Sequence, residues 1–151
     1  MTEELLDISL KVIGIVRNGI NQRPEPGWEE IVSEIVVDSR LTEALDGLEE
    51  FSHIIVIYWI HQVPAPGQVP TKIHPRGRQE LPLVGLFATR TPYRPNPVGV
   101  TTVRLLQRQG NILKVEGLDA IDSTPVIDIK PYIPGLDAVT EAKVPSWVIK
   151  L

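Results

Sequence analysis

Short stretches in which apolar and polar residues alternate run through most of the sequence, and they predict β structure. The apolar positions are rich in Val and Ile, which favour strands, while 14 prolines and 11 glycines divide the chain into short pieces. The pattern predicts strands over residues 8–16, 31–37, 54–60, 84–88, 98–108, 112–118, 126–129 and 147–149. Thr42 to Glu50 predicts a short helix, because leucines recur there near helical spacing, although Gly47 weakens it.

Together these segments predict a mainly β fold, a closed antiparallel β-barrel of about seven strands with one or two short helices. Almost no helix is available to connect parallel strands, which favours antiparallel pairing. Residues 98–108 and 112–118 form a predicted hairpin, because Gly110-Asn111 supplies the positive φ of a tight turn. Residues 54–60 are apolar on both faces, which predicts a buried central strand. We expect a single domain, residues 1–151, and periodicity alone leaves a β-sandwich open.

The composition narrows the class of protein. The longest apolar run, Ile54 to Ile60, is far shorter than the ~20 residues of a membrane-spanning helix, and the acidic N-terminus leads into no apolar signal core. The sequence has no cysteine and no histidine pair at zinc spacing, so we expect neither a disulfide nor a metal site. These features predict a cytoplasmic protein. Its net charge of −4 means that RNA contact would need a local basic patch or a partner subunit.

A proline-rich basic loop follows the predicted strand at 84–88. Three prolines fix the backbone φ within residues 92–97, so the loop loses little entropy when it binds a ligand. Arg90 and Arg94 are four residues apart with no acid between them, and each offers a planar fork of donors suited to carboxylates or phosphates. The loop therefore predicts an anion site. The alternative is a rigid surface turn whose arginines pair with nearby acids.

Acidic residues gather in a second segment, residues 117–132. Asp119, Asp122 and Asp128 are more acids than a turn requires. For residues 122–125 the simpler interpretation is a turn whose side chains hydrogen-bond their own backbone. Asp128 and Lys130 are two apart on a predicted strand, so they share a face and are placed to form an ion pair.

The two segments together resemble the signature of the TsaA/TrmO family. The first reads Phe-Ala-Thr-Arg-x-Pro-x-Arg-Pro-Asn-Pro-x-Gly over residues 87–99, and the second reads Asp-x-Thr-Pro-Val-x-Asp-Ile-Lys-Pro-Tyr over residues 122–132. The resemblance extends over nearly the whole chain. It implies a β-barrel that binds S-adenosylmethionine, usually as a homodimer, and that methylates N6 of threonylcarbamoyladenosine beside the anticodon of certain tRNAs.

The resemblance also implies cofactor-binding positions. They are Asn21, Gln22, Arg23, His61, Gln62, Arg90, Val100, Asp122, Ser123, Thr124 and Pro125. Arg90 would fork onto the carboxylate of S-adenosylmethionine, Asp122 would accept from its amine or ribose, and His61 would supply a neutral hydrogen bond. Ser123 stands where the family has glycine. If that glycine supplies a positive φ or a close backbone approach, serine would weaken the site.

The implied reaction needs further groups. N6 of the substrate belongs to a urea and is a poor nucleophile until its proton leaves, so a general base would help, with Asp128, Tyr132 and Asp122 as candidates. The threonyl carboxylate of the substrate needs a cation, for which Arg94 and Lys130 are candidates. Such an anion receptor would discriminate against unmodified adenosine.

Four cationic or titratable residues recur every second position in the proline-rich stretch 63–82, namely Lys72, His74, Arg76 and Arg78. On an extended segment they would line one side and form a basic stripe for RNA. The alternative is a solvated loop with scattered charge.

Two other classes of function remain open from the sequence. A non-catalytic module that binds S-adenosylmethionine or another adenine nucleotide would suit the acidic charge and the end of the chain soon after the barrel motif. A purely structural RNA-binding barrel is disfavoured, because the sequence has no broad basic or aromatic surface.

Overall fold

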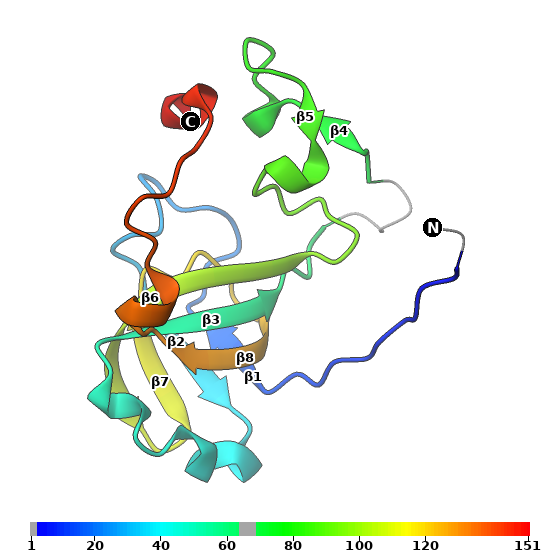
Figure 1. Ribbon diagram of the computed structural model, residues 1–151. Helices are drawn as coiled ribbons and strands as arrows, with labels where there is room; N and C mark the ends of the chain where they lie inside the picture. The colour runs from blue at the N-terminus through cyan, green and yellow to red at the C-terminus, as the bar shows by residue number, and fades with distance from the viewer. Residues whose placement is uncertain (1–2, 64–68) are drawn as a thin grey trace.

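Six antiparallel strands close into a barrel in the computed structural model, which describes residues 3–63 and 69–151 (Figure 1). The strands are β1 (Gly14–Arg17), β2 (Val32–Val37), β3 (His53–Trp59), β6 (Val98–Gln109), β7 (Ile112–Glu116) and β8 (Pro125–Pro131). Their order is β1-β2-β7-β6-β3-β8, and β8 pairs with β1 to complete the ring. The predicted mainly β, closed antiparallel barrel is confirmed, with six strands in place of about seven.

Alternate side chains of each strand fill the barrel. Val16, Ile35, Ile54, Leu113 and Val126 have no exposed surface. Burying each such aliphatic side chain contributes roughly 1.5–3 kcal/mol to folding. The end of the barrel below these residues is covered by two 3-10 helices, η1 (Ser39–Leu45) and η2 (Leu48–Glu50), whose leucines pack on the core.

β3 is a central strand, as predicted, because it pairs with β6 on one side and with β8 on the other. Its inward residues Ile54, Val56 and Tyr58 are buried, while the outward side chains are only half-buried. The pairing with β8 shifts between Ile57 and Tyr58, which face Asp128 and Val126, so one residue of β8 bulges out of the ladder. Bulges often lie beside functional sites, because they redirect side chains.

The hairpin of β6 and β7 is also confirmed. Gly110 has a φ of 60° in its turn. The predicted strands at 31–37, 98–108 and 126–129 all exist with small changes at their ends, and the strand at 112–118 ends at Glu116.

The predicted strand over residues 8–16 is wrong for residues 8–13. Ile13 still donates its backbone N–H to Val126 of β8 and accepts from Asp38. β2 ends at Val37, where the chain turns into η1, and no backbone hydrogen bond joins residues 3–12 to another described residue. Ile8, Leu10 and Val12 are instead exposed on an extended arm that leaves the barrel (Figure 1). Alternation of apolar residues therefore predicted a strand that has no partner.

Three further predictions are corrected. The helix at 42–50 is replaced by η1 and η2, because Gly47 adopts a left-handed φ of 90° between them. The strand at 84–88 is limited to β5 (Val84–Gly85), followed by the 3-10 helix η5 (Leu86–Ala88). Residues 147–149 lie in the 3-10 helix η6 (Ser146–Lys150), not in a strand.

An excursion between β3 and β6 stands outside the barrel (Figure 1). It contains β4 (Lys72–Ile73), the 3-10 helix η4 (Pro75–Gly77), β5 and η5, and β4 pairs with β5. Residues 64–68 of the predicted loop lie outside the described residues. A single-turn helix, α1 (Pro134–Asp137), follows β8. None of the helices described in residues 3–63 and 69–151 is long and apolar enough to cross a membrane.

Candidate functional site

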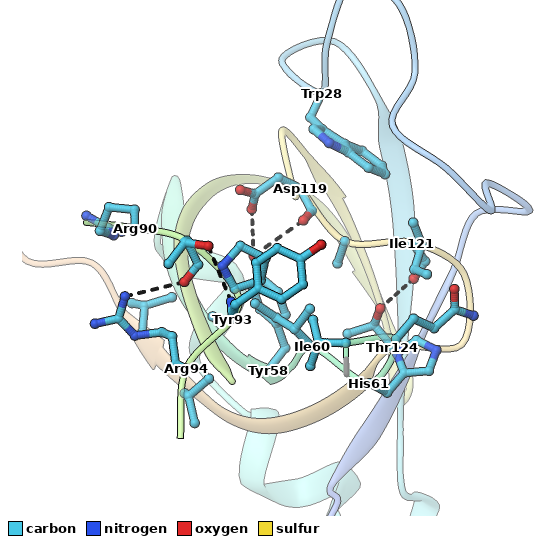
Figure 2. Close-up of a pocket in the computed structure, with 18 residues that line it drawn as sticks. Trp28, Tyr58, Ile60, His61, Arg90, Tyr93, Arg94, Asp119, Ile121 and Thr124 are labelled. Atoms are coloured by element: carbon cyan, nitrogen blue, oxygen red, sulfur yellow. Dashed lines mark hydrogen bonds between the residues drawn. The ribbon is translucent and has the colours of Figure 1, made fainter. Parts of the chain in front are cut away.

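A cavity of about 720 Å³ opens at one end of the barrel, where β3 ends and β6 begins (Figure 2). Five parts of the chain line it: the β1–β2 connection, the end of β3 and the residues after it, the proline-rich loop, the start of β6, and the β7–β8 connection. The lining residues are Trp28, Tyr58, Ile60, His61, Gln62, Val63, Arg90, Thr91, Pro92, Tyr93, Arg94, Val98, Gly99, Val100, Asp119, Ala120, Ile121 and Thr124. Its size and its mixture of apolar and polar lining are typical of small-molecule sites.

The proline-rich loop uses its two arginines differently. Arg94 Nη1 donates to the carbonyl oxygens of Thr89 at 2.8 Å and Thr91 at 3.3 Å. The same guanidinium lies 5.6 Å from the centre of the Phe87 ring, so Arg94 braces the loop internally. Arg90 is exposed and makes no hydrogen bond or ion pair with any described residue. The predicted anion site therefore has its accessible cation at Arg90.

A hydrogen-bonded cluster also lines the cavity. Asp119 Oδ1 accepts from the Tyr58 hydroxyl at 2.8 Å and from the Thr101 hydroxyl. Tyr58 can lie here only because residue 99 is glycine. A Cβ at Gly99 would come within 2.4 Å of the Tyr58 ring. The β3–β6 pairing that sets Tyr58 opposite Gly99 thus also positions Asp119.

The Tyr58 hydroxyl is a donor over the whole physiological pH range. Burial, above all, raises its pKa well above the ordinary value for tyrosine, and the neighbouring carboxylate of Asp119 raises it further. The neutral phenol can then donate to Asp119 and cannot act as a base near neutral pH.

His61 and Thr124 lie on the opposite side of the cavity from Arg90 and Arg94 (Figure 2). The Thr124 hydroxyl donates to the carbonyl of Ile121 at 2.7 Å, which fixes the β7–β8 connection. His61 Nδ1 is buried and has no hydrogen-bond partner among the described residues. A buried polar atom without a partner is costly in the free protein, so it points to a bound group that would satisfy it.

Asp122 lies outside this cavity, in a shallower depression beside Asn18 and Gly19. Its Oδ1 accepts from the backbone N–H of Asn18 at 2.8 Å and of Gly19 at 2.9 Å. These two bonds, that of Gly19 first, lower the pKa of the Asp122 carboxyl. Asp122 therefore clamps the loop after β1. Its side chain bonds this distant backbone and no backbone group of its own turn among the described residues, which differs from the turn interpretation.

Ser123 has a left-handed φ of 69°. This conformation favours glycine and strains other residues. A positive φ, one of the two reasons considered for the family's glycine, is therefore present at this position. Ser123 Oγ lies 3.3 Å from Asp122 Oδ2, and its backbone N–H donates to Val16. The side chain faces the Asp122 depression and not the main cavity.

The cavity thus brings together only some of the residues that the family resemblance implies. His61, Gln62, Arg90, Val100 and Thr124 line it, as does the substrate candidate Arg94. Asn21, Gln22 and Arg23 are exposed in the loop after β1 and do not line the cavity. Pro125 begins β8 just below the cavity.

The remaining site candidates on β8 lie elsewhere. Asp128 and Lys130 form the predicted ion pair, with Nζ and Oδ2 3.0 Å apart, and neither lines the cavity. Tyr132 lies beside His53, their ring centres 6.4 Å apart, at the end of β3 opposite the cavity. The structure gives none of the three a contact with the cavity lining.

The proposed geometry of the basic stripe is wrong. Residues 75–77 form η4, in which Arg76 has a left-handed φ of 53°, so the segment is not extended. His74 Nδ1 bonds the Leu81 carbonyl, and Arg78 pairs with Glu80 at 2.6 Å and with the Lys150 carbonyl. Lys72 and Arg76 are exposed. RNA contact by these residues stays a prediction without the single-sided stripe that suggested it.

Sequence reasoning missed Trp28, Tyr58 and the role of Asp119. Tyr58 falls within an apolar run and is read as core, and Trp28 lies far from both signature segments. The feature that identifies Tyr58 is its pairing with Gly99 of β6. That pairing is visible only once the register of the two strands is known from the structure.

The fold and the cavity define a closed β-barrel with a pocket of small-molecule size at one end. The model of the tRNA-methyltransferase O N-terminal domain matches residues 17–138, so this chain belongs to that family. A probable S-adenosyl-L-methionine-binding protein of Methanothermobacter thermautotrophicus is 42% identical over 138 residues, which cover 89% of this chain and 96% of the relative.

Two further relatives extend the comparison. The tRNA (adenine(37)-N6)-methyltransferase of Escherichia coli is 34% identical over 143 residues, which cover 86% of this chain and 60% of that enzyme. The crystal structure of TrmO from Pseudomonas aeruginosa superimposes with a TM-score of 0.72 at 30% identity, and the match covers 91% of this chain and 62% of that one. This chain therefore spans nearly the full length of the archaeal relative and less than two thirds of the bacterial ones.

Proposed function

We propose that this chain binds S-adenosylmethionine in the barrel-end cavity and methylates N6 of threonylcarbamoyladenosine beside the anticodon of tRNA. The observation that carries the proposal is the cavity itself. In a chain of the TrmO family, it presents an exposed cation, Arg90, that pairs with no described residue, together with a hydrogen-bonded carboxylate, Asp119. The name of the Escherichia coli relative supplies the reaction and its substrate.

The residues of the cavity fit the cofactor. Arg90 offers two parallel N–H donors to a carboxylate, and His61 Nδ1 lacks a partner that a bound hydroxyl or amine would provide. The Gln62 amide and the exposed face of Val100 add a polar and an apolar contact. When bound, S-adenosylmethionine supplies a methyl group on a positively charged sulfur.

Cationic residues other than Arg90 would bind the modified nucleoside and the tRNA phosphates. Arg94 uses Nη1 for its own loop, and its Nη2 donates to no described residue, so it can meet the threonyl carboxylate at the cavity rim. Lys130 is the second candidate and would first have to leave Asp128. The exposed cations Lys72 and Arg76, with Arg78 beside them, are candidates for contacts with tRNA phosphates.

The proposal includes a homodimer and a cytoplasmic location. Half-buried Ile55, Ile57 and Trp59 line the outer face of β3, so a second copy would cover apolar surface. The cytoplasmic location follows from the proposed substrate, because tRNA is present in the cytoplasm.

A non-catalytic S-adenosylmethionine-binding module is the second candidate. It is favoured by one observation: the chain spans 96% of an archaeal relative that is named only for binding, and 60% of the named methyltransferase.

Label transfer separates the two candidates. Purified protein is incubated with methyl-tritiated S-adenosylmethionine and tRNA transcripts with or without the threonylcarbamoyl group. We expect label only in the modified tRNA. Binding of S-adenosylhomocysteine without label in either tRNA would contradict the enzyme and favour the binding module.

A further inference from the structure

Asp119 is the single acidic side chain that lines the cavity, as far as the described residues 3–63 and 69–151 show. Its Oδ1 is held by two hydroxyl donors, Tyr58 at 2.8 Å and Thr101. Its Oδ2 accepts no hydrogen bond from any described residue, and the side chain is exposed toward the cavity. One oxygen therefore fixes the orientation of the carboxylate, and the other remains available to a ligand.

The hydroxyl donors also settle which group of the cluster can take a proton. Tyr58 keeps its own proton at neutral pH, because burial raises the pKa of its hydroxyl. Thr101 is an aliphatic alcohol with no comparable acidity. Of the three side chains, only the carboxylate has a basic oxygen that can take up a proton, since both hydroxyls donate theirs to it.

Other carboxylates near the cavity have different partners. Asp122 accepts two backbone N–H groups in the neighbouring depression. Asp128 pairs with Lys130 away from the cavity lining. Neither carboxylate is placed to meet a group bound beside Tyr58.

Two aromatic side chains, Trp28 and Tyr93, line the same cavity as Asp119 (Figure 2). Flat aromatic faces at a cavity rim suit a nucleobase, whose edge would then point to the polar groups of the floor. An adenine edge carries N–H groups, which complement an acceptor and not a donor.

We propose that Asp119 Oδ2 accepts the N6–H hydrogen bond of threonylcarbamoyladenosine and takes that proton during methyl transfer. The inference rests on the proposed function. The N6 electron pair forms the new bond to the methyl carbon, the carbon–sulfur bond breaks with its electrons on sulfur, and the N6 proton forms the O–H bond of Asp119. The positive sulfonium and the negative carboxylate both end neutral, so charge balances.

A binding measurement tests the hydrogen bond without turnover. An anticodon stem-loop carrying threonylcarbamoyladenosine is compared with one already methylated at N6, both with S-adenosylhomocysteine present. The wild type should bind the N6–H form about tenfold or more tightly, the value of a hydrogen bond to a charged group. In Asp119→Asn the amide oxygen replaces Oδ1 and its NH₂ faces the cavity, so this preference should disappear.

A second measurement tests the proton transfer. Asp119→Asn should lower the single-turnover rate of methyl transfer by about 10²–10⁴-fold, the range for general base catalysis, while its affinity for S-adenosylhomocysteine stays within about twofold. Tyr58→Phe and Thr101→Val each remove one donor to Oδ1 and should lower the rate less. Asp46→Asn, on the surface beside Arg108, controls for loss of a carboxylate.

Two results would overturn the inference. One is an Asp119→Asn variant that transfers methyl groups at the wild-type rate and keeps the N6–H preference. The other is a larger loss in Asp128→Asn than in Asp119→Asn. If Asp119→Asn does not fold, a wild-type rate in both Tyr58→Phe and Thr101→Val has the same meaning. A wild-type protein that methylates no modified tRNA overturns the proposed function itself, and this inference with it.

Discussion

The β7–β8 connection carries two aspartates three residues apart that face different surroundings. Asp119 faces the main cavity, where two side-chain hydroxyls hold one of its oxygens. Asp122 faces the outer depression, where two backbone N–H groups bind one of its oxygens. Asp119 shares its cavity with Arg90, which pairs with no described residue, whereas Asp122 lies beside a strained serine.

The difference suits the proposed ligand role for the Asp119 carboxylate and a structural role for the Asp122 carboxylate. Side-chain hydroxyls orient Asp119 and leave Oδ2 accessible, whereas the backbone of Asn18 and Gly19 depends on Asp122 to satisfy its N–H groups. Removing the first should change chemistry more than stability. Removing the second should change stability more than chemistry.

The largest expected effect on the cavity side is at Arg90. Arg90→Ala removes the accessible cation and should weaken S-adenosylhomocysteine binding by about 1.5–3 kcal/mol, roughly 10- to 150-fold, the range for a charge-assisted hydrogen bond. Isothermal titration calorimetry measures the change. Arg90→Lys keeps the charge without the planar fork and should lose less. Equal binding by wild type and Arg90→Ala would remove Arg90 from the site.

Gly99→Ala should disturb the contact between Tyr58 and Asp119 in the cavity, because it adds a methyl group against the Tyr58 ring. The added Cβ would lie within 2.4 Å of the Tyr58 ring, so Tyr58 must move away from Asp119. Overpacking of this kind costs roughly 1–3 kcal/mol, visible as a lower Tm in thermal unfolding. Gly85→Ala is the matched control, because a Cβ there meets no atom within 4 Å. An unchanged Tm in Gly99→Ala would show that Tyr58 moves freely.

Asp122→Asn should destabilise the outer side in a way that depends on pH. The folded state lowers the pKa of Asp122, so its stabilising contribution is present above the aspartate's unfolded pKa, about 3.9, and is lost as the pH falls through the lower folded value. The Tm difference between wild type and Asp122→Asn should therefore be largest near neutral pH and shrink in acid. Asp7→Asn, in the exposed N-terminal arm, controls for the lost charge. A Tm difference that stays the same at every pH would contradict a stabilising role for the ionised Asp122 carboxylate.

The smallest expected effect is at Ser123. Ser123→Gly relieves a φ of 69° but gives the unfolded chain more freedom, so the net gain in stability should be at most about 1 kcal/mol. Ser123→Ala keeps the strain and tests the hydroxyl alone. Chemical denaturation resolves the two. A loss of stability in Ser123→Gly would mean that the hydroxyl, not the backbone, decides this position.

The barrel could be predicted from the sequence because alternation and burial coincide in its strands. β6 and β7 follow the pattern closely, and Gly110 marks their turn. The same pattern failed for Ile8, Leu10 and Val12, since alternation says nothing about whether a partner strand is present. It failed again at Trp147, where the three-residue run is too short to distinguish a strand from a 3-10 turn.

The cavity could be predicted only in part. Arg90 and Arg94 stood out, yet nothing in the sequence shows that Arg94 would bond its own loop while Arg90 stays accessible. The excess of aspartates was visible, but their separation depends on which way each side chain turns. Asp128 was a candidate general base, yet it lies away from the cavity lining, because the register of β8, with its bulge, is a tertiary property.

The most direct test of the division between the two aspartates compares Asp119→Asn and Asp122→Asn on the same modified tRNA. Single-turnover methyl transfer and Tm are measured for both variants and the wild type. We expect Asp119→Asn to lose at least about 100-fold in rate with little change in Tm, and Asp122→Asn to lose Tm with a rate within about tenfold of the wild type. The reverse assignment, with the rate collapsing in Asp122→Asn and preserved in Asp119→Asn, would contradict the account.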